Sequence, residues 1–383
     1  MPSVMLSCGE ASGDLYAAAL VAALRARVPD LECCGFGGPR LAAAGARLVG
    51  GYEGLTVTGL VEALPVIRRG FHMRDALVQA ARDRRPDVFI AIDFPDFNLR
   101  VLPAMQRLGV PIVYYISPQF WAWRAGRLKT IRRYVDRMLV IFPFEQTLYE
   151  DAGVPVEFVG HPLIDLLAKT QPRETWLRSL GLDPAAPTVA LLPGSRPSEL
   201  GHILPTLVDA ARLIRARVTN AQFVLARAPG LTSSDVAPFD ALTAAGIPAA
   251  MVEGATDDAL ANSDVAITAS GTATVQAALH ERPMVVVYRL SPLTYAIGKW
   301  LVRVSTYGMV NLVAGRSVVP ELIQHDFTPA RVAAETIDLL TNHVRAAQMR
   351  ADLREVRVKL GGGGASGRAA EAVLATMKRS LAG

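Results

Sequence analysis

The chain has 383 residues, with 40 Lys or Arg against 35 Asp or Glu, so its formal net charge is +5. Hydrophobic residues make up 51% and charged residues 20%, a balance that excludes a disordered chain, a collagen-like fibre and a low-complexity array. At about 150 residues per domain, the length predicts two domains. The sequence contains no run of about 18 uncharged apolar residues, which excludes a helix that spans a bilayer.

The amino terminus and the cysteines indicate the compartment. The first residues read as a strand and lack the basic region of a signal peptide. Cys8, Cys33 and Cys34 fit neither a disulfide framework nor the ligand spacing of a zinc site. We therefore expect a cytoplasmic protein.

Short apolar runs alternate with helical patterns through the first half of the chain. The run at 87–92 is continuously apolar, as in a parallel strand buried on both faces. This alternation predicts a parallel sheet covered by helices on both faces. The predicted strands are 4–8, 33–37, 87–92, 111–116 and 137–141, and the predicted helices are 13–28, 99–108 and 129–134.

The segment 165–183 is polar and mixed, and the same alternation restarts after it. We therefore predict two Rossmann-like, doubly wound α/β domains at 1–165 and 166–360, which face a central cleft where ligands bind. The predicted strands of the second domain are 189–192, 222–226, 249–252, 265–268 and 284–287, and its predicted helices are 198–218, 235–245, 257–262 and 272–280.

Four consecutive glycines, 361–364, predict a flexible tether, and 366–381 predicts a terminal helix with Ser366 as its N-cap. Within 361–383, this helix either returns to the first domain or is swapped onto a partner in a homodimer.

The candidate site residues follow the predicted strands. Gly9-Glu10-Ala11-Ser12-Gly13-Asp14 comes after the first strand, where glycines allow a tight turn and free N–H groups of a helix favour an anion. The segment is not G-x-G-x-x-G, so it does not indicate a dinucleotide site. Glu10 is either a capping carboxylate or a carboxylate that contacts a sugar or acts as a base.

Asp93-Phe94-Pro95-Asp96-Phe97-Asn98 follows the most apolar strand. A base that activates a hydroxyl needs a carboxylate held at a cleft, and we favour that role for Asp93. For Asp96 we favour a helix cap.

Aromatic and basic residues gather in two further segments. In 117–124, Trp121 and Trp123 offer faces for sugar rings or acyl chains, while Arg124 and Arg127 suit a phosphate; an aromatic packing corner is the alternative. The segment 57–74 mixes bulky apolar residues with arginines, which fits a membrane interface or an ordinary amphipathic helix. Pro65 argues against one continuous helix there.

Two loops of the second domain have small residues between a strand and a helix. Gly194-Ser195-Arg196 and Ser270-Gly271-Thr272 lack the Walker lysine pattern, and together they indicate a diphosphate held by backbone amides and Arg196. Taken singly, tight turns explain such loops equally well. His161 is more often structural than functional. No Asp-x-Asp occurs and the six histidines are scattered, so we expect no metal and no cofactor.

These motifs, taken in chain order, resemble the lipid-A-disaccharide synthase family. The resemblance covers almost the whole chain, and only the combination is specific. The matching stretches are 9–14, 93–98, 117–124, Gly160-His161-Pro162, 191–196, 269–273 and Asn311-Leu312-Val313-Ala314-Gly315.

The resemblance implies a glycosyltransferase of the GT-B fold at the cytoplasmic face of the inner membrane, without nucleic-acid partners. It implies transfer of 2,3-diacylglucosamine from its UDP derivative to 2,3-diacylglucosamine 1-phosphate, with inversion and without a metal, to give a β-1,6-linked disaccharide and UDP. Asp93 would deprotonate the acceptor 6-hydroxyl, Glu10 would be an essential carboxylate, and Arg196 would neutralise the leaving diphosphate.

The resemblance also implies two sets of binding residues. The UDP-sugar set is Gly194, Ser195, Arg196, Ser270, Gly271, Thr272, Gln276 and Asn311. The acceptor set is Ser12, Gly13, Asp14, Asp96, Asn98, Pro118, Trp121, Trp123 and Arg124.

The sequence departs from the family at two positions of the nucleotide half. Gln276 stands where the family usually has a glutamate that grips the ribose, and Val310 stands where it has proline. The open alternatives are a family member with an altered donor, a UDP-sugar epimerase of the same fold, and a binding module that has lost activity.

Overall fold

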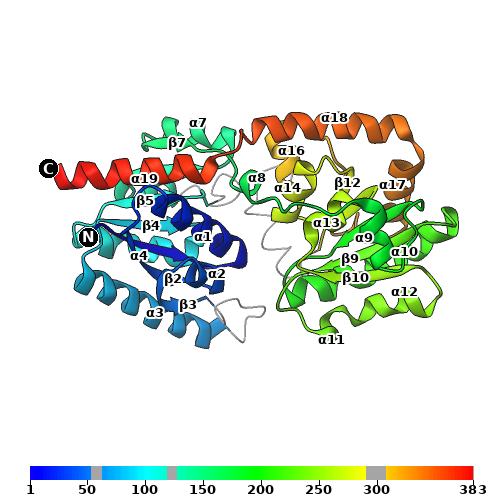
Figure 1. Ribbon diagram of the computed structural model, residues 1–383, viewed down its shortest axis with the longest axis horizontal. Helices are drawn as coiled ribbons and strands as arrows, with labels where there is room; N and C mark the ends of the chain where they lie inside the picture. The colour runs from blue at the N-terminus through cyan, green and yellow to red at the C-terminus, as the bar shows by residue number, and fades with distance from the viewer. Residues whose placement is uncertain (53–62, 119–126, 290–307, 383) are drawn as a thin grey trace. The chain divides into compact units, whose positions relative to one another are not determined.

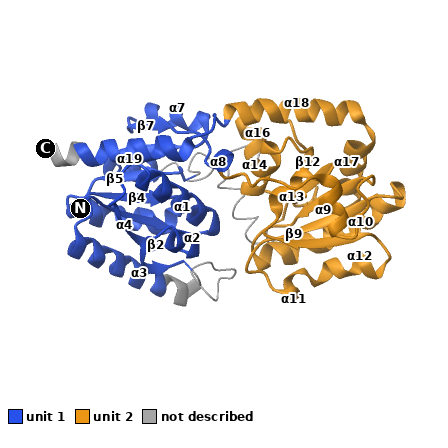
Figure 2. Ribbon diagram, in the orientation of Figure 1, with its two compact units in different colours: residues 1–165, 360–383 blue, residues 166–359 orange. Residues whose placement is uncertain are grey.

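The computed structural model describes residues 1–52, 63–118, 127–289 and 308–382, and the side chains of these residues except 63–67 and 379–382. The chain divides into two compact units, in which residues 1–165 and 360–383 form unit 1 and residues 166–359 form unit 2 (Figure 2). Each unit contains a parallel sheet with helices around it (Figure 1), which confirms the predicted fold class. The cleft between the units stays a prediction.

The sheet of unit 1 has seven strands in the order β3-β2-β1-β4-β5-β6-β7, and every neighbouring pair is parallel. All residues of β4 are buried, as expected from its uninterrupted apolar sequence. The strands are β1 (Ser3–Cys8), β2 (Glu32–Gly37), β3 (Arg47–Gly51), β4 (Val88–Ile92), β5 (Ile112–Tyr115), β6 (Arg137–Val140) and β7 (Val156–Phe158).

Helices cover this sheet in two groups. α1 packs beside α2 and α19, whereas α4 packs beside α3 and α6. Buried side chains of α3, α4, α6 and α7 form one core cluster with alternate residues of the strands, such as Phe89 and Ala91 of β4. The helices are α1 (Ala11–Arg25), α2 (Pro39–Ala43), α3 (Ala63–Arg84), α4 (Pro95–Arg107), α6 (Arg127–Tyr134), α7 (Pro143–Asp151), α8 (Leu163–Leu166) and α19 (Ala365–Ala382).

Pro65 lies near the start of helix α3, and the expectation that no single helix covers 57–74 is untested before Ala63. Pro65 is the third residue of the helix, in the first turn, where a missing N–H costs no intrahelical bond. The helix therefore runs without interruption from Ala63 to Arg84. The rest of the predicted membrane segment, 57–62, lies outside the described residues.

The sheet of unit 2 has six parallel strands in the order β10-β9-β8-β11-β12-β13. Its strands are β8 (Thr188–Leu192), β9 (Gln222–Arg227), β10 (Ala249–Glu253), β11 (Val265–Ala269), β12 (Met284–Tyr288) and β13 (Glu321–Ile323). Its helices are α9 (Arg173–Ser179), α10 (Pro197–Arg217), α11 (Ser233–Val236), α12 (Asp240–Ala244), α13 (Thr256–Ala261), α14 (Thr272–Leu279), α16 (Met309–Ala314), α17 (Pro329–Thr341) and α18 (His343–Lys359).

The single helix predicted over 235–245 is wrong. The chain forms α11, a 3₁₀ turn at Ala237–Phe239 and then α12. Pro238 lies in the middle of this stretch and lacks the N–H that a continuous helix requires.

The four-glycine segment is held in place by hydrogen bonds, where the sequence predicts a flexible tether. Gly364 N donates to Asp165 Oδ1 (2.6 Å), and the Arg368 guanidinium donates to the carbonyls of Val159, Gly362 and Gly363 at 2.8–3.0 Å. Helix α19 then packs against α1 of the same unit (Figure 1). It begins at Ala365, so Ser366 lies inside the helix and is not its N-cap.

Candidate active site

In unit 1 the strand order reverses between β1 and β4, which are neighbours in the sheet. The register pairs Cys8 with Ile92, the last residues of the two strands. Glu10 follows shortly after β1, and Asp93 follows β4 directly. Ligands of doubly wound sheets bind outside the carboxyl ends of the strands at such a switch point. The fold thus brings the two predicted catalytic positions to the same part of the sheet edge.

The turn after β4 has an unusual backbone. Asp93 and Phe94 have φ values of 45° and 49°, a left-handed conformation that costs a non-glycine residue about 1–3 kcal/mol. Hydrogen bonds fix this conformation: Asp93 N donates to Tyr115 O (3.1 Å), and Asp93 O accepts bonds from Tyr114 Oη and Asn98 Nδ2, both at 2.7 Å. The half-buried Asp93 side chain therefore projects from a backbone with one defined conformation.

Asn98 supports this turn from inside the unit. It is fully buried, its Nδ2 also donates to Ser7 O (3.2 Å), and its Oδ1 accepts a bond from Ser7 Oγ (2.6 Å). These bonds hold the Asn98 side chain against the backbone of Ser7 and Asp93, and its contact with an acceptor stays a prediction. Burial, with a further contribution from the charge of Asp93, raises the pKa of Tyr114 well above its usual range, so the phenol keeps the proton that it donates.

The turn after β1 is shaped by a close approach to the turn after β4. A Cβ atom on Gly9 would lie 2.0 Å from the Phe94 ring, so no larger residue fits. The Phe94 ring stacks on Phe97, with centroids 5.4 Å apart. Gly13 is buried in α1, and Ser12 is half-buried one residue earlier.

Asp14, which we expected at the acceptor, caps another helix. Its side chain is buried and accepts hydrogen bonds from the backbone amides of Gly38 (2.8 Å), Arg40 (2.9 Å) and Leu41 (3.1 Å) at the start of α2. Both carboxylate oxygens are used by these amides. Asp14 therefore stabilises the start of α2.

The end of β5 completes this edge. Ile116 follows the strand with φ 67°, an outlier for a β-branched residue. Ser117 is buried and its Oγ bonds Tyr149 Oη (2.7 Å). Pro118 is the last described residue before the segment 119–126, so the predicted acceptor contacts Trp121, Trp123 and Arg124 lie outside the described residues.

Asp96, for which the sequence favoured a helix cap, lies in the first turn of α4 and pairs with Arg127 of α6. Its side chain is 64% exposed, so this carboxylate is accessible from solvent, although the ion pair itself contributes little to stability.

Unit 2 has a second switch point, between β8 and β11. Gly194, Ser195 and Arg196 follow β8 and precede α10, and Gly194 has φ 121°, which favours glycine. The carboxylate of Glu199 lies over this loop: its Oε2 accepts a bond from Ser195 N (3.2 Å), and its Oε1 lies 3.5 Å from Arg196 Nη1.

The loop after β11 lies beside it in the sheet. Gly271 has φ 141° and is followed by Thr272, the exposed first residue of α14. Ser270 N donates to Val287 O of the neighbouring strand (3.1 Å), which fixes the start of the loop. The fold thus brings together the two loops that the sequence predicts to hold a diphosphate.

Gln276 of α14 takes part in a polar cluster that sequence reasoning missed. Its Nε2 donates to Asp257 Oδ1 (3.1 Å), which also bonds His280 Nε2 (2.8 Å), and Asp257 Oδ2 accepts a bond from Ala168 N (3.0 Å). Burial alone would raise the pKa of Asp257, but the bonds from His280, Ala168 and Gln276 outweigh it and lower that pKa. Asp257 therefore fixes the orientation of the Gln276 amide.

Asn311, predicted to contact the nucleotide, is buried within unit 2. Its Nδ2 donates to Val319 O (2.9 Å) and Glu321 Oε1 (2.6 Å), and its Oδ1 accepts bonds from the amides of Val318 and Val319. These four bonds use the amide completely, so Asn311 holds α16 to β13.

The contacts that the structure shows for His161 are those of a structural residue. Its ring is buried, packs edge-on against Tyr16 and accepts a bond from Leu163 N at Nδ1 (3.2 Å). Burial lowers the pKa of His161 to about 3, so the ring is neutral near pH 7.

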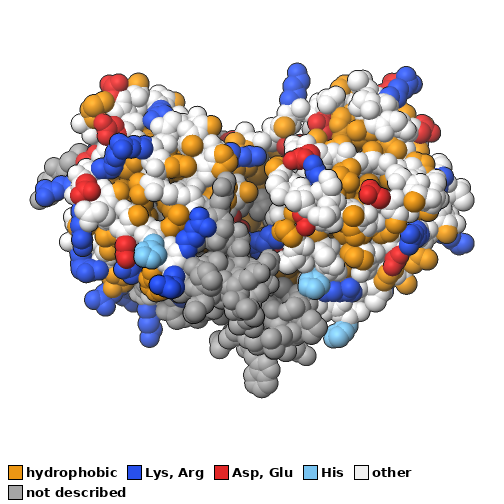
Figure 3. All heavy atoms as spheres, turned by 90° about the horizontal axis from the view of Figure 1, so that it is seen from below, with side chains coloured by type: hydrophobic (Ala, Val, Ile, Leu, Met, Phe, Trp, Pro, Cys, Tyr) orange, Lys and Arg blue, Asp and Glu red, His pale blue; other side chains and the backbone are white. Residues whose placement is uncertain are grey.

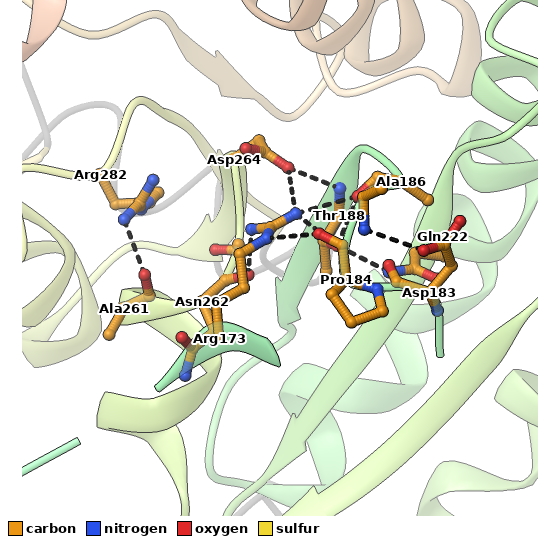
Figure 4. A network of polar contacts seen from close by, with 12 residues as sticks. Arg173, Asp183, Pro184, Ala186, Thr188, Gln222, Ala261, Asn262, Asp264 and Arg282 are labelled. Carbon is orange, nitrogen blue, oxygen red and sulfur yellow. Dashed lines mark hydrogen bonds and ion pairs between the residues drawn. The ribbon is translucent and has the colours of Figure 1, made fainter. Parts of the chain in front are cut away.

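A polar network of unit 2 lies at the opposite end of its strands (Figure 4). Arg173 donates to Asn262 O (2.5 Å), Ala186 O (2.9 Å) and Asp264 Oδ2 (3.0 Å), and Asp264 Oδ2 also accepts a bond from Thr188 N (2.8 Å). These residues tie the starts of β8 and β11 together. Since ligands bind at the carboxyl ends, this network is structural.

Among the residues that the structure describes, no group of three or more His, Cys, Asp or Glu could hold a metal ion. The same part of the chain has no helix that is long and apolar enough to cross a membrane. On the face shown in Figure 3, Lys and Arg side chains lie among acidic and hydrophobic ones.

Comparisons with known proteins give the family context. The family model for lipid-A-disaccharide synthetase matches residues 4–375. The chain is 44% identical over 373 residues to the lipid-A-disaccharide synthase of Myxococcus xanthus, with 97% of both chains covered. It is 45% identical over 381 residues to the lipid-A-disaccharide synthase of Geobacter sulfurreducens, with 99% of this chain and 98% of the relative covered.

Solved structures with low sequence identity share the fold. The UDP-GlcNAc 2-epimerase from Neisseria meningitidis, bound to UDP-GlcNAc, matches with a TM-score of 0.69 at 11% identity and covers 98% of this chain and 100% of its own. The calicheamicin glycosyltransferase CalG4 matches with a TM-score of 0.59 at 15% identity and 99% coverage of both chains.

Proposed function

Because the chain belongs to the lipid-A-disaccharide synthase family, a family of glycosyltransferases, we propose that it joins two diacylated glucosamine units. The donor is UDP-2,3-diacylglucosamine and the acceptor is 2,3-diacylglucosamine 1-phosphate. The products are the β-1,6-linked disaccharide 1-phosphate and UDP, and the anomeric configuration of the donor inverts.

One observation carries this proposal beyond the family: the two switch points have complementary chemistry. The edge of unit 1 presents Glu10 and Asp93, and the edge of unit 2 presents two glycine loops beside Arg196. A carboxylate suits an acceptor hydroxyl that must lose a proton, and amides with a guanidinium suit a diphosphate that gains charge as it leaves.

In this mechanism, Asp93 takes the proton of the acceptor 6-hydroxyl. The O6 atom forms a bond to C1 of the donor sugar while the bond from C1 to the β-phosphate oxygen breaks, and its electron pair leaves with UDP. The backbone turn fixed by Tyr114 and Asn98 supports this role, because a base must be held within hydrogen-bond reach of its proton. Glu10 is the second carboxylate of this edge.

Arg196 and the amides of 194–195 and 270–272 stabilise the departing diphosphate without a metal ion. Gln276 contacts the ribose through its carbonyl oxygen, and the bond from one N–H of its Nε2 to Asp257 orients the amide for this contact. Asn311 contributes to the site indirectly, because its hydrogen bonds hold α16 in place. The exposed Thr272 is available to the phosphate groups.

On the acceptor side, Ser12, Gly13, Asp96 and Pro118 remain candidates for contact with the lipid. Trp121, Trp123 and Arg124 extend this set. We assign the membrane contact to 57–74. The Phe71 side chain of this segment is 43% exposed, and Arg74 and Arg100, the latter from α4, both lie over its ring. This exposed aromatic ring among cations supports a peripheral position on an anionic membrane surface, at the cytoplasmic face of the inner membrane.

The test supplies the purified protein with both diacylated sugars and analyses the products by mass spectrometry. We expect a tetra-acylated disaccharide monophosphate together with UDP in equal amounts. UDP released without the disaccharide, or no turnover at all, would contradict the proposal.

A UDP-sugar epimerase is the alternative with the same fold. Incubation with UDP-GlcNAc alone, followed by NMR, separates the two functions, because an epimerase needs no acceptor lipid. The 44–45% identity to lipid-A-disaccharide synthases, against 11% to the Neisseria epimerase, favours the synthase.

A further inference from the structure

The diphosphate loop of unit 2 already contains an anion of the protein. Glu199 belongs to the first turn of α10, and its Oε2 accepts a hydrogen bond from Ser195 N (3.2 Å). A Cβ atom on Gly194 would lie only 2.6 Å from the same oxygen. The carboxylate therefore rests directly against the loop, and its side chain is 21% exposed.

The position that Glu199 occupies suits a phosphate oxygen. Ser195 N points toward it from the start of a 21-residue helix, and the Arg196 guanidinium lies 3.5 Å from the other carboxylate oxygen. Backbone amides at a helix start and an arginine are the partners that recur in phosphate sites. A carboxylate can satisfy both, although with one charge against the larger charge of a diphosphate.

Tyr288, the last residue of β12, is affected by the same charges, although β11 lies between β8 and β12 in the sheet. Burial raises the pKa of Tyr288, the charge of Glu199 raises it further, and Arg196 opposes this effect. The carboxylate and the guanidinium thus both lie close enough to Tyr288 to act on its phenol. Their charges are concentrated at the carboxyl end of the sheet, where the nucleotide would bind.

We propose that Glu199 occupies the position of a nucleotide phosphate in the 194–196 loop and competes with UDP for Ser195 N and Arg196. This inference rests on the proposed function, which provides the UDP. Glu199 has to leave the amide when the diphosphate enters, and it returns as the product departs. The residue therefore weakens UDP binding and speeds product release, a step that limits turnover in many enzymes.

The experiment measures UDP binding by isothermal titration calorimetry for the wild-type protein and for Glu199→Gln. Glutamine keeps an oxygen that can accept from Ser195 N but removes the competing charge. We expect UDP to bind roughly tenfold more tightly to the variant, because charge-assisted bonds are about twice as strong as neutral ones. Uridine, which carries no phosphate, should bind both proteins equally.

Asp209→Asn is the matched control. Asp209 lies on the same helix and pairs with Arg212 in the same i, i+3 arrangement (3.0 Å), roughly 15 Å further along α10. The Asp209→Asn substitution removes the same charge from unit 2 as Glu199→Gln does, and we expect it to leave the affinities for UDP and uridine unchanged.

The alternative role of Glu199 is a helix cap alone. A cap predicts that Glu199→Gln lowers the urea midpoint of unfolding while UDP affinity is unchanged or reduced, and that result would overturn the inference. If the wild-type protein binds no UDP, the proposed nucleotide site fails instead. If Asp209→Asn tightens UDP binding as much as Glu199→Gln does, the effect is one of net charge and the inference also fails.

Discussion

The switch points of the two units make the same kind of turn with different residues. In unit 1 the chain leaves β4 through two non-glycine residues with positive φ, Asp93 and Phe94. In unit 2 it leaves β8 and β11 through Gly194 and Gly271, for which positive φ is easy. Positive φ at non-glycine residues thus occurs where the proposed function needs a side chain, and glycines stand where it needs backbone amides.

This contrast predicts that the edge of unit 1 acts through chemistry and that of unit 2 through binding. The largest expected effect is that of Asp93→Asn. Loss of the base lowers kcat by about 10²–10⁴-fold, while UDP affinity stays at the wild-type value. Product formation with both substrates and UDP titration are measured on the same preparation. Near-normal turnover in this variant would remove Asp93 as the base.

Arg196→Gln tests the other side of the contrast. It removes the cation beside the leaving diphosphate, so we expect kcat/KM to fall by about 10²–10³-fold and UDP to bind more weakly. Calorimetry and initial rates give the two values. A variant with unchanged UDP affinity would show that the amides alone hold the nucleotide.

Asn98→Ala asks whether the strained turn depends on its support. The substitution leaves Ser7 Oγ without its buried partner and removes one of the two side-chain bonds to the carbonyl of Asp93, so we expect a loss of about 2–4 kcal/mol in the free energy of unfolding. We expect kcat to fall by a larger factor than KM changes, because the proposed base Asp93 is no longer held in position. Urea unfolding and steady-state kinetics check both. A stable variant with normal kcat would mean that the turn holds its conformation by itself.

Gly271→Ala tests the glycine turns of unit 2. A Cβ atom there meets no atom within 4 Å, so only the φ of 141° opposes alanine, and we expect a loss of about 1–2 kcal/mol in stability. Gly194→Ala should cost more, since its Cβ also meets Glu199. Thermal unfolding of the two variants gives the order, and equal costs would count against the contact with Glu199.

Tyr114→Phe gives the smallest expected effect. It removes one of the two bonds to the carbonyl of Asp93, which is worth about 1 kcal/mol of stability. We expect kcat to fall severalfold with KM and UDP affinity unchanged. A larger effect on KM than on kcat would indicate a direct contact with the acceptor instead.

The sequence predicts the central strands of both sheets because these strands are apolar runs, but it misses the partly exposed edge strands β3, β7 and β13. All five residues of β4 and of β8 are buried, and positions after such strands necessarily reach the carboxyl edge. The grouping of Glu10 with Asp93, and of 194–196 with 270–272, therefore follows from strand positions alone.

The direction of a polar side chain could not be predicted in the same way. Asp14 and Asn98 stand in motifs that follow strands, and Asn311 stands in a motif of α16, yet each is buried and bonds the protein's own backbone. A motif shows that a residue type is required but not whether ligand or fold requires it. The positive φ of Asp93 is equally invisible, because it is imposed by Tyr114 and Asn98 from other elements.

The contacts of the glycine segment depend on distant partners as well. Four glycines suggest freedom of the chain, but Arg368 and Asp165 bind this backbone from residues on either side of unit 2 in the sequence. No local pattern relates two segments that lie about two hundred residues apart.

The position of α19 has a consequence for biosynthesis. Ala369 and Val373 of this helix are fully buried in unit 1, next to α1, yet the ribosome adds them only after the whole of unit 2. Throughout translation of unit 2, the face of the nascent amino-terminal sheet beside α1 lacks its cover. Unit 2 is continuous in sequence and can fold first, and the nascent chain has to protect an apolar surface until α19 has been synthesised.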